Sequence, residues 1–366
     1  MHGGGPRPCV AHRTRSPRWH GVSPRPWPYA PAGASQAPTR SPSYRPEKPS
    51  TRPPDYSADR TPATSTRSTP PRTPCSASWA GSPAALAWAP LIRYLDQELA
   101  HRPRTAITRT RHGDLVAVTT SDLIQRFLYL HGVWEPYLTA WIRGRLTRGD
   151  TFIDVGAHTG YYTLLASRLV GAPGRVVAIE ASPAFHTSLT EAVQRNACHK
   201  VRTVNAAAAD TARTLTFYLQ DTANLGNTSA VQPKTSHSSF QIGALPLPEI
   251  LSPHELAAAR LIKIDFEGAE AFLMEGLAPV LGNLRPDVEL VIEVTPRSLA
   301  KQGKSVHDVL EPLRAHGFHT YRIANDYDPT SYPSAVRRPA APECWDGPIS
   351  DMTDLIFSRV DADQLR

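Results

Sequence analysis

Cysteine is scarce in this sequence, and the few cysteines that occur lie far apart. The four cysteines are Cys9, Cys75, Cys198 and Cys344, and no two of them form a C-x-x-C pair. This scatter disfavours a disulfide framework and suits a reducing compartment. The 14 histidines show no zinc-ligand spacing either, so a structural zinc site is not expected.

Long apolar runs are also lacking. No stretch approaches the ~20 apolar residues of a membrane span, so no membrane-spanning segment is predicted. The beginning of the chain lacks the apolar core of a secretory signal, and its proline density forbids the amphipathic helix of a transit peptide. Together with the scattered cysteines, this predicts a cytoplasmic protein.

Acidic residues are nearly absent from the first quarter of the chain. Residues 1–85 hold 12 Lys+Arg against 3 Asp+Glu and half of the 36 prolines, whereas the remainder holds 28 against 30. The net charge of +7 therefore comes from this segment. It has no apolar run at helical or strand spacing, so we expect a disordered tail. A solvated linker or an upstream extension of the reading frame explains it most simply, and a basic arm that contacts RNA or acidic lipid is the alternative.

The apolar pattern divides the rest of the chain into two parts. Residues 86–150 predict a helical cap, with a helix broken at Pro90, a polar connection, a strand in DLVAVTT and two short helices in 121–146. Residues 151–366 alternate apolar strands with helices, which is typical of a parallel sheet covered on both faces. The expected strands are Thr151–Val155, Arg175–Glu180, Val201–Ala206, Leu261–Asp265 and Val288–Val294, followed by HTYRI and Leu355–Arg359. The expected helices are Tyr161–Val170, Pro183–Ala197, Ala269–Leu281 and one from Ser305 to Gly317, and TLTFYLQ is an added strand before a polar loop.

A glycine turn with an acid at its mouth follows the first of these strands. In FIDVGAHTGYY, Asp154 ends the strand, Gly156 opens the turn and Gly160 begins the next helix. A dinucleotide site would carry G-x-G-x-x-G and present helix amides to phosphate, which Asp154 would repel. S-adenosylmethionine fits better, because its ammonium and sulfonium groups are cationic and it has no phosphate. Tight packing of strand and helix is the alternative explanation of the glycines.

Further polar residues follow the neighbouring strands. Glu180 ends the second strand, where an acid can accept both ribose hydroxyls of an adenosine, although it would also favour a helix N-terminus. Asn205 and Asp210 follow the third strand, where an adenine ring would be flanked or a turn stabilised. The predicted cofactor-binding set is therefore Asp154, Gly156, Ala157, His158, Gly160, Glu180, Ala181, Asn205, Asp210 and Asp265.

The most specific stretch is LIKIDFEGAEAFLMEGL at 261–277. Lys263 interrupts an apolar strand that ends in Asp265, Glu267 and Glu270. Charges this close to a sheet core need a reason, and a site beside the methyl donor supplies one. Glu270 has the simpler alternatives of capping its helix or pairing with Lys263.

These motifs carry a family resemblance. DVGAHTGYYTLLAS, AIEASPAFHTSL, VNAAAAD and KIDFEGAEAFLMEGL resemble the FkbM-type S-adenosylmethionine-dependent methyltransferases, with Trp134, Glu135 and Pro136 also in a familiar place. The resemblance covers about 114–359 and excludes the tail. It implies a class I methyltransferase, Rossmann-like fold: a seven-stranded, mostly parallel sheet of order 3-2-1-4-5-7-6 with the last strand antiparallel. One departure is Leu247-Pro248, where the family often has Leu-Asp.

The resemblance also implies an activity, which is O-methylation of a hydroxyl on a sugar, polyketide or other secondary metabolite. Such displacement at a sulfonium methyl needs positioning and a base, for which we expect Asp265 or Glu267, with His158 as second choice. Asp265, Glu267 and Glu293 offer magnesium ligands, but acids at a strand end need no ion, and no metal is predicted.

Three rival functions stay open on the sequence. A nicotinamide oxidoreductase is disfavoured by Asp154 and the missing third glycine. A methyltransferase acting on RNA or protein would share the cofactor site; a D/N-P-P-Y/F motif is absent and the chain after the tail is nearly neutral, so we expect a small-molecule or glycan acceptor and no nucleic acid. A non-enzymatic nucleic-acid or lipid binder would act through the basic tail. Acceptor specificity is expected in 121–145, 221–240 and 324–352.

Overall fold

The computed structural model describes residues 83–219, 228–229, 238–266 and 269–360. The predicted tail therefore lies outside the described residues except for its last three positions, which begin a helix. Glu267 and most of the polar loop predicted at 221–240 also lie outside them. Among the described residues, no helix combines the length and the apolar character that crossing a membrane requires.

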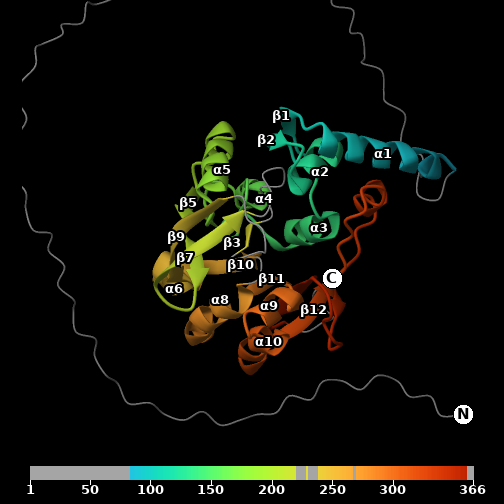
Figure 1. Ribbon diagram of the computed structural model, residues 1–366. Helices are drawn as coiled ribbons and strands as arrows, with labels where there is room; N and C mark the ends of the chain where they lie inside the picture. The colour runs from blue at the N-terminus through green and yellow to red at the C-terminus, as the bar shows by residue number, and fades with distance from the viewer. Residues whose placement is uncertain (1–82, 220–227, 230–237, 267–268, 361–366) are drawn as a thin grey trace, which may run out of the picture. The chain divides into compact units, whose positions relative to one another are not determined.

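One mixed sheet of eight strands forms the centre of the fold (Figure 1). In spatial order the strands are β5 (Val201–Asn205), β4 (Arg175–Glu180), β3 (Thr151–Val155), β10 (Ala259–Ile264), β11 (Glu289–Val294), β14 (Thr353–Ser358), β12 (His319–Ile323) and β13 (Glu343–Cys344). The first five run parallel, and β14 is antiparallel to both of its neighbours. The predicted number of seven strands is thus wrong, because β13 pairs with β12 and adds an eighth strand at the edge. A strand of two residues has no periodicity by which the sequence could reveal it.

Helices cover both faces of the sheet, and adjacent strand residues point to opposite cores. Phe152 packs with α2 (Leu123–His131), α3 (Pro136–Arg145) and α4 (Tyr161–Val170) in one cluster, whereas Ile153 packs with α8 (Glu270–Leu277) and α10 (Val306–Ala315) in the other. Burial on both faces explains why these strands are almost wholly apolar. The remaining helices around the sheet are α5 (Pro183–Arg195), α6 (Leu247–Ile250), α7 (Pro253–Ala258), α9 (Pro296–Lys301), α11 (Tyr332–Ala335) and the 3-10 helix η1 (Ala278–Asn283). The helix expected over 269–281 is therefore α8 followed by η1.

The segment before β3 differs from its prediction in two ways. Helix α1 (Pro83–His101) runs through Pro90 without a break. Proline removes one hydrogen bond and bends a helix, but the C-terminal half of α1 is held by burial of Leu99 and an ion pair from Asp96 to Arg126. The polar connection contains a strand, β1 (Thr105–Arg109), which forms an antiparallel hairpin with β2 (Leu115–Thr119). One face of β1 is exposed, so its sequence lacks the apolar character of a core strand.

A second, smaller sheet lies next to the end of β5. Its order is β6 (Ala207–Ala209), β9 (Ser238–Pro246), β7 (Arg213–Leu219) and β8 (Thr228–Ser229). β7 is the added strand expected from TLTFYLQ, and β9, which pairs with it, was not predicted. Phe217 and Phe240 stack across these two strands, and Phe266 meets Phe217 edge to face. The small sheet thereby supplies an apolar wall beside the carboxyl end of β10.

Candidate functional site

Asp154 lies buried beneath the glycine turn. Its side chain is 1% exposed, and Thr163 from α4 donates a hydrogen bond to Oδ2 at 2.6 Å. The other oxygen, Oδ1, has no hydrogen-bond partner among the described residues. Burial raises the pKa of this carboxyl, and the Lys263 ammonium opposes the rise. A buried acceptor without a donor is costly, so this oxygen is suited to a ligand that brings one.

The turn itself brings two strand ends into close contact. Gly156 has a φ of +80°, and a Cβ placed on it would lie 1.8 Å from the carbonyl oxygen of Asp265. The backbone amide of Gly156 donates to the carbonyl oxygen of Ile179 at 2.9 Å, and the backbone amide of Asp265 donates to the carbonyl oxygen of Val155 at 3.0 Å. Gly160 has a φ of +93°, and its added Cβ would lie 2.7 Å from Leu189. Only glycine fits at these two positions, which explains the predicted motif.

Glu180 organises the neighbouring strand end. Its carboxylate accepts from the backbone amides of Ser182 at 2.8 Å and His158 at 2.7 Å. A carboxylate has about four acceptor positions, so both oxygens retain capacity for further donors. Asn205 donates from its amide to the carbonyls of Glu180 and Ala181, at 2.8 and 3.1 Å, and so supports this loop from behind.

These groups surround a cavity of about 100 Å³ at the carboxyl edge of the sheet. Five of the predicted residues line it, namely Gly156, His158, Glu180, Ala181 and Asp265. The residues that line it without having been predicted are Ile124, Ser182, Phe185, Phe217 and Phe266. The other predicted residues do not line it, namely Asp154, Ala157, Gly160, Asn205 and Asp210, and Asp210 forms an ion pair with Arg213 at 2.7 Å instead. Ser182 and Phe185 follow Glu180 closely in sequence, and this nearness is the signal that could have identified them.

His158 is held by an acid that the sequence did not single out. Its Nε2 lies 3.6 Å from Asp122 Oδ2, while Asp122 Oδ1 accepts from the amide of Gln125 and caps α2. The His158 ring also lies 3.9 Å from the ring of Phe185, centroid to centroid. Burial opposes the charged form of His158, but Asp122 and Glu180 outweigh it and raise its pKa. This arrangement favours the protonated, imidazolium form of His158, which holds α2 over the cavity. An imidazolium already carries its proton, so His158 does not suit the role of proton acceptor.

Asp265 reaches the cavity from the end of β10. Lys263, whose side chain is 4% exposed, donates from Nζ to Asp265 Oδ2 at 2.8 Å. Burial of Lys263 disfavours its charge, but Asp265, Asp154 and Glu135 together raise its pKa. Glu270, the first residue of α8, is fully buried.

A group of three acids adjoins Asp265 on the side away from Glu180. Carboxylate oxygens of Glu135, Glu293 and Asp354 lie within 4.8 Å of one another, where the ends of β11 and β14 meet the turn between α2 and α3. Glu135 accepts from the hydroxyls of Tyr162 at 2.6 Å and Tyr327 at 2.8 Å. We call these five residues the acid cluster.

Burial favours the protonated form of two acids in the acid cluster, Glu135 and Asp354. Burial, and then the charge of Asp354, raises the pKa of Glu135 to about 8. Burial likewise raises the pKa of Asp354 to about 6, although Asn325 donates to it at 2.7 Å. Closely spaced carboxylates repel one another, so protonation of one member is favoured. The neutral member allows the acids to lie this close together. Of the magnesium ligands weighed from the sequence, only Glu293 belongs to this group.

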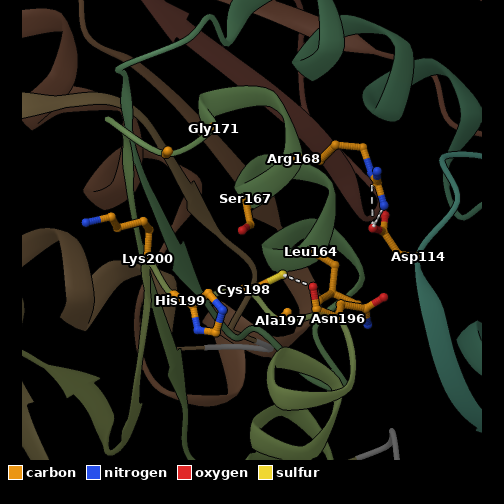
Figure 2. Close-up of a pocket in the computed structure, with 11 residues that line it drawn as sticks. Asp114, Leu164, Ser167, Arg168, Gly171, Asn196, Ala197, Cys198, His199 and Lys200 are labelled. Carbon is orange, nitrogen blue, oxygen red and sulfur yellow. Dashed lines mark hydrogen bonds and ion pairs between the residues drawn. The ribbon is translucent and has the colours of Figure 1, made fainter. Parts of the chain in front are cut away.

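A larger cavity, of about 400 Å³, lies elsewhere (Figure 2). Its lining comes from the ends of α4 and α5 and the loop before β5, and includes Arg168, Cys198 and Lys200. Helix ends of this kind lie at the edge where the parallel strands begin, whereas ligands of such sheets bind where the strands end. None of the predicted site residues lines it, so the smaller cavity is the candidate site.

Residues 154–320 match the family model described as the methyltransferase FkbM domain. The chain contains an FkbM methyltransferase domain. The match begins at Asp154 and includes Glu180 and Asp265, and it covers every residue that lines the cavity except Ile124. The predicted family is confirmed for these residues. No curated protein matches the sequence.

Solved structures resemble the FkbM domain at low identity. Methyltransferase FkbM from Methylobacillus flagellatus KT is 17% identical with a TM-score of 0.40, over 74% of this chain and 60% of that one. This chain thus spans less than two thirds of that protein. A SAM-dependent O-methyltransferase from Thermotoga maritima is 13% identical with a TM-score of 0.34, over 69% of this chain and 76% of that one. A TehB-like SAM-dependent methyltransferase from Corynebacterium glutamicum is 16% identical with a TM-score of 0.33, over 64% and 92%.

Proposed function

We propose that this protein is an S-adenosylmethionine-dependent methyltransferase that methylates a hydroxyl group of a small-molecule or glycan acceptor. The observation that carries the proposal is Asp154 Oδ1, a buried acceptor to which none of the described residues donates, beneath a glycine turn in an FkbM domain. The ammonium group of the methionine end would supply the missing donor. A buried carboxylate also attracts the positive sulfonium.

The residues around the cavity fit the rest of this cofactor. Glu180 has acceptor positions left for the two ribose hydroxyls, and Asn205 holds the strand end from which it projects. Gly156 and Gly160, with Ala157 and His158 between them, allow the ligand to approach the backbone. The rings of Phe185, Phe217 and Phe266 offer apolar walls for the adenine ring of the cofactor. Asp210, paired with Arg213, takes no direct part in this proposal.

Bound S-adenosylmethionine supplies an electrophilic methyl group, and the chain supplies orientation and a proton acceptor. We assign the proton acceptor to Asp265, which lines the cavity with its Oδ2 held by Lys263. When an acceptor hydroxyl is methylated, Asp265 would take up the proton that the hydroxyl loses. Glu267, the other candidate, lies outside the described residues. His158 is assigned to binding, since Asp122 and Glu180 favour its protonated form.

The acid cluster suits an acceptor rich in hydroxyl groups. Its half-buried members, Glu293 and Tyr327, can offer hydrogen bonds to the hydroxyl groups of a sugar or polyketide. Grouped acids repel phosphate, which disfavours RNA as the acceptor in this site. Tyr327 belongs to the segment 324–352, where acceptor specificity was expected.

Titration with S-adenosylhomocysteine tests the proposal. Wild-type protein should bind it, and Asp154→Asn should weaken binding about tenfold or more, because a buried charge-assisted hydrogen bond is lost. Asp287→Asn is the matched control, because Asp287 lies before β11 at the opposite edge and pairs with Arg285. Its affinity should equal that of the wild type. Failure of the wild type to bind, or equal affinity in Asp154→Asn, would exclude this site.

A turnover assay tests the chemistry separately. Asp265→Asn should retain S-adenosylhomocysteine binding but lose about 100-fold or more in turnover with a hydroxylated acceptor, as expected for loss of a general base. If turnover survives in Asp265→Asn with binding intact, the proton acceptor is another group.

A further inference from the structure

His158 links the glycine turn to helix α2. It has a left-handed backbone conformation with a φ of +50°, which is unfavourable for a residue with a Cβ. In this conformation its backbone amide donates to Glu180 Oε2 at 2.7 Å, and its ring Nε2 faces Asp122 Oδ2 at 3.6 Å. One residue therefore connects the carboxylate at the end of β4 with the residue that caps α2, and the contacts on both sides offset its strain.

The contact between Asp122 and His158 is shielded from solvent. The two side chains are 4% and 17% exposed, and the ring of Phe185 lies against the imidazole at 3.9 Å between centroids. Among the described residues, no group lies within hydrogen-bond distance of His158 Nε2, so the charge of Asp122 is the interaction that this nitrogen makes. An ion pair in such surroundings is screened less than one in water.

Asp122 also fixes the start of α2, which forms part of the cavity wall. Its Oδ1 accepts from the backbone amide of Gln125 at 2.9 Å. Ile124, in the first turn of the helix, lines the cavity together with His158 and Glu180. The two oxygens of one carboxylate therefore connect a helix that bounds the cavity with the turn that forms its floor.

We propose that Asp122 is a positioning residue of the cofactor site, which acts through His158 to hold both the amide that Glu180 accepts and the wall that α2 forms. The inference rests on the proposed function, because Glu180 is the acid assigned there to the ribose hydroxyls. With Asp122 ionised and His158 protonated, the turn keeps its left-handed conformation and Glu180 keeps its place in the cavity before the cofactor binds. Asp122 thereby lowers the cost of ordering the site during binding.

The charge of His158 makes this contribution depend on pH. Three acids face the imidazole, namely Asp122 before α2, Glu180 at the end of β4 and Asp265 after β10, and Arg126 faces Asp122 from within α2. Burial opposes the charged form, but the acids outweigh it and raise the pKa of His158 above its ordinary 6.5. More than half of His158 is therefore protonated at pH 6.5. The ion pair is lost as pH rises through the raised pKa.

Titration of the full chain with S-adenosylhomocysteine at two pH values tests the proposal. Asp122→Asn removes the charge but keeps a good cap for α2, because asparagine and aspartate are about equal in this role. Its affinity should be about tenfold weaker than that of the wild type at about pH 6.5, and the difference should shrink toward about pH 9 as His158 loses its proton. Both proteins are compared at the same pH, so titration of the ligand's own amine cancels.

A second variant separates the ion pair from the helix cap. His158→Asn removes the imidazole, and asparagine adopts the left-handed backbone more readily than most residues with a side chain. In this background Asp122→Asn should change the affinity by less than about twofold, because the partner of its charge is gone. Asp287→Asn, which removes an acid at the opposite edge of the sheet, should bind like the wild type at both pH values.

The outcomes distinguish a failure of this inference from a failure of the proposed function. A wild-type protein that does not bind S-adenosylhomocysteine at either pH would overturn both. Binding by the wild type with equal affinity in Asp122→Asn at the lower pH would overturn the inference alone. A loss of affinity that is the same at both pH values, or that persists in His158→Asn, would also overturn it, because Asp122 would then act without His158.

Discussion

The contact between Gly156 and Asp265 allows the site geometry to be tested by one methyl group. Replacing Gly156 with alanine places a Cβ 1.8 Å from the Asp265 carbonyl, so the two strand ends must separate by more than about 1 Å. The left-handed backbone costs about 1–2 kcal/mol for alanine, and overpacking adds about 1–3 kcal/mol. We therefore expect Gly156→Ala to lower the free energy of unfolding by about 2–5 kcal/mol.

Gly317→Ala is a matched control for backbone strain. Gly317 has a φ of +79°, against +80° for Gly156, but an added Cβ meets nothing within 4 Å. Its substitution should cost only the backbone penalty of about 1–2 kcal/mol. Urea denaturation measures both variants, and titration with S-adenosylhomocysteine should show a loss of affinity in Gly156→Ala alone. Equal destabilisation of the two variants, with unchanged affinity, would refute the close approach of β3 and β10.

Three further predictions concern the buried charges. Lys263→Met should destabilise the fold by about 3–5 kcal/mol in urea, because Asp265, Asp154 and Glu135 lose their shared cation; a change below about 1 kcal/mol would contradict this. Glu135 has a folded pKa of about 8 against an ordinary 4.5, so the folded state binds more protons in this range, and its contribution to stability should fall as pH rises from 4.5 to about 8. Glu135→Gln should remove that part of the slope, and an unchanged slope would show that another group titrates. Glu289→Gln should lower the free energy of unfolding by about 3 kcal/mol or more, because Arg145 and Arg260 both pair with this buried acid. A change near zero would show that solvent hydrates the two arginines in the variant.

The central strands and the glycine turn could be predicted from the sequence because their determinants are local. β3 and β4 are buried on both faces, and their bounds follow from the continuous apolar runs. The bounds of α4 were predicted to the residue, since Gly160 and Gly171 flank it. Asp154, Glu180 and Asp265 lie at or just beyond strand ends, and parallel strands bring their ends to one edge.

Contacts across long sequence separations could not be predicted in this way. Glu135 accepts a hydrogen bond from the hydroxyl of Tyr327, which is 192 positions away in the sequence. Only the fold reveals that the turn before α3 and this distant loop lie together. Likewise, Asp122 caps α2 with one oxygen while its second oxygen faces His158, and the sequence did not single it out for either contact. The pairing of β9 with β7 depends on two segments separated by residues outside the described range. Periodicity contains information about burial, but not about which polar partner a buried group meets.

Electrostatics connects Asp154 beneath the glycine turn with the acid cluster. Lys263 lies within range of Asp154, Asp265 and Glu135, so one ammonium offsets acids on both sides. The acids exceed this single cation, and the raised pKa values of Glu135 and Asp354 show that protons supply part of the missing positive charge. A cationic methyl donor would supply more of it and would lose its sulfonium charge when the methyl group leaves. The carboxylates would therefore attract the product, which has lost the sulfonium charge, less strongly than they attract the donor. This difference would favour dissociation of the product after transfer.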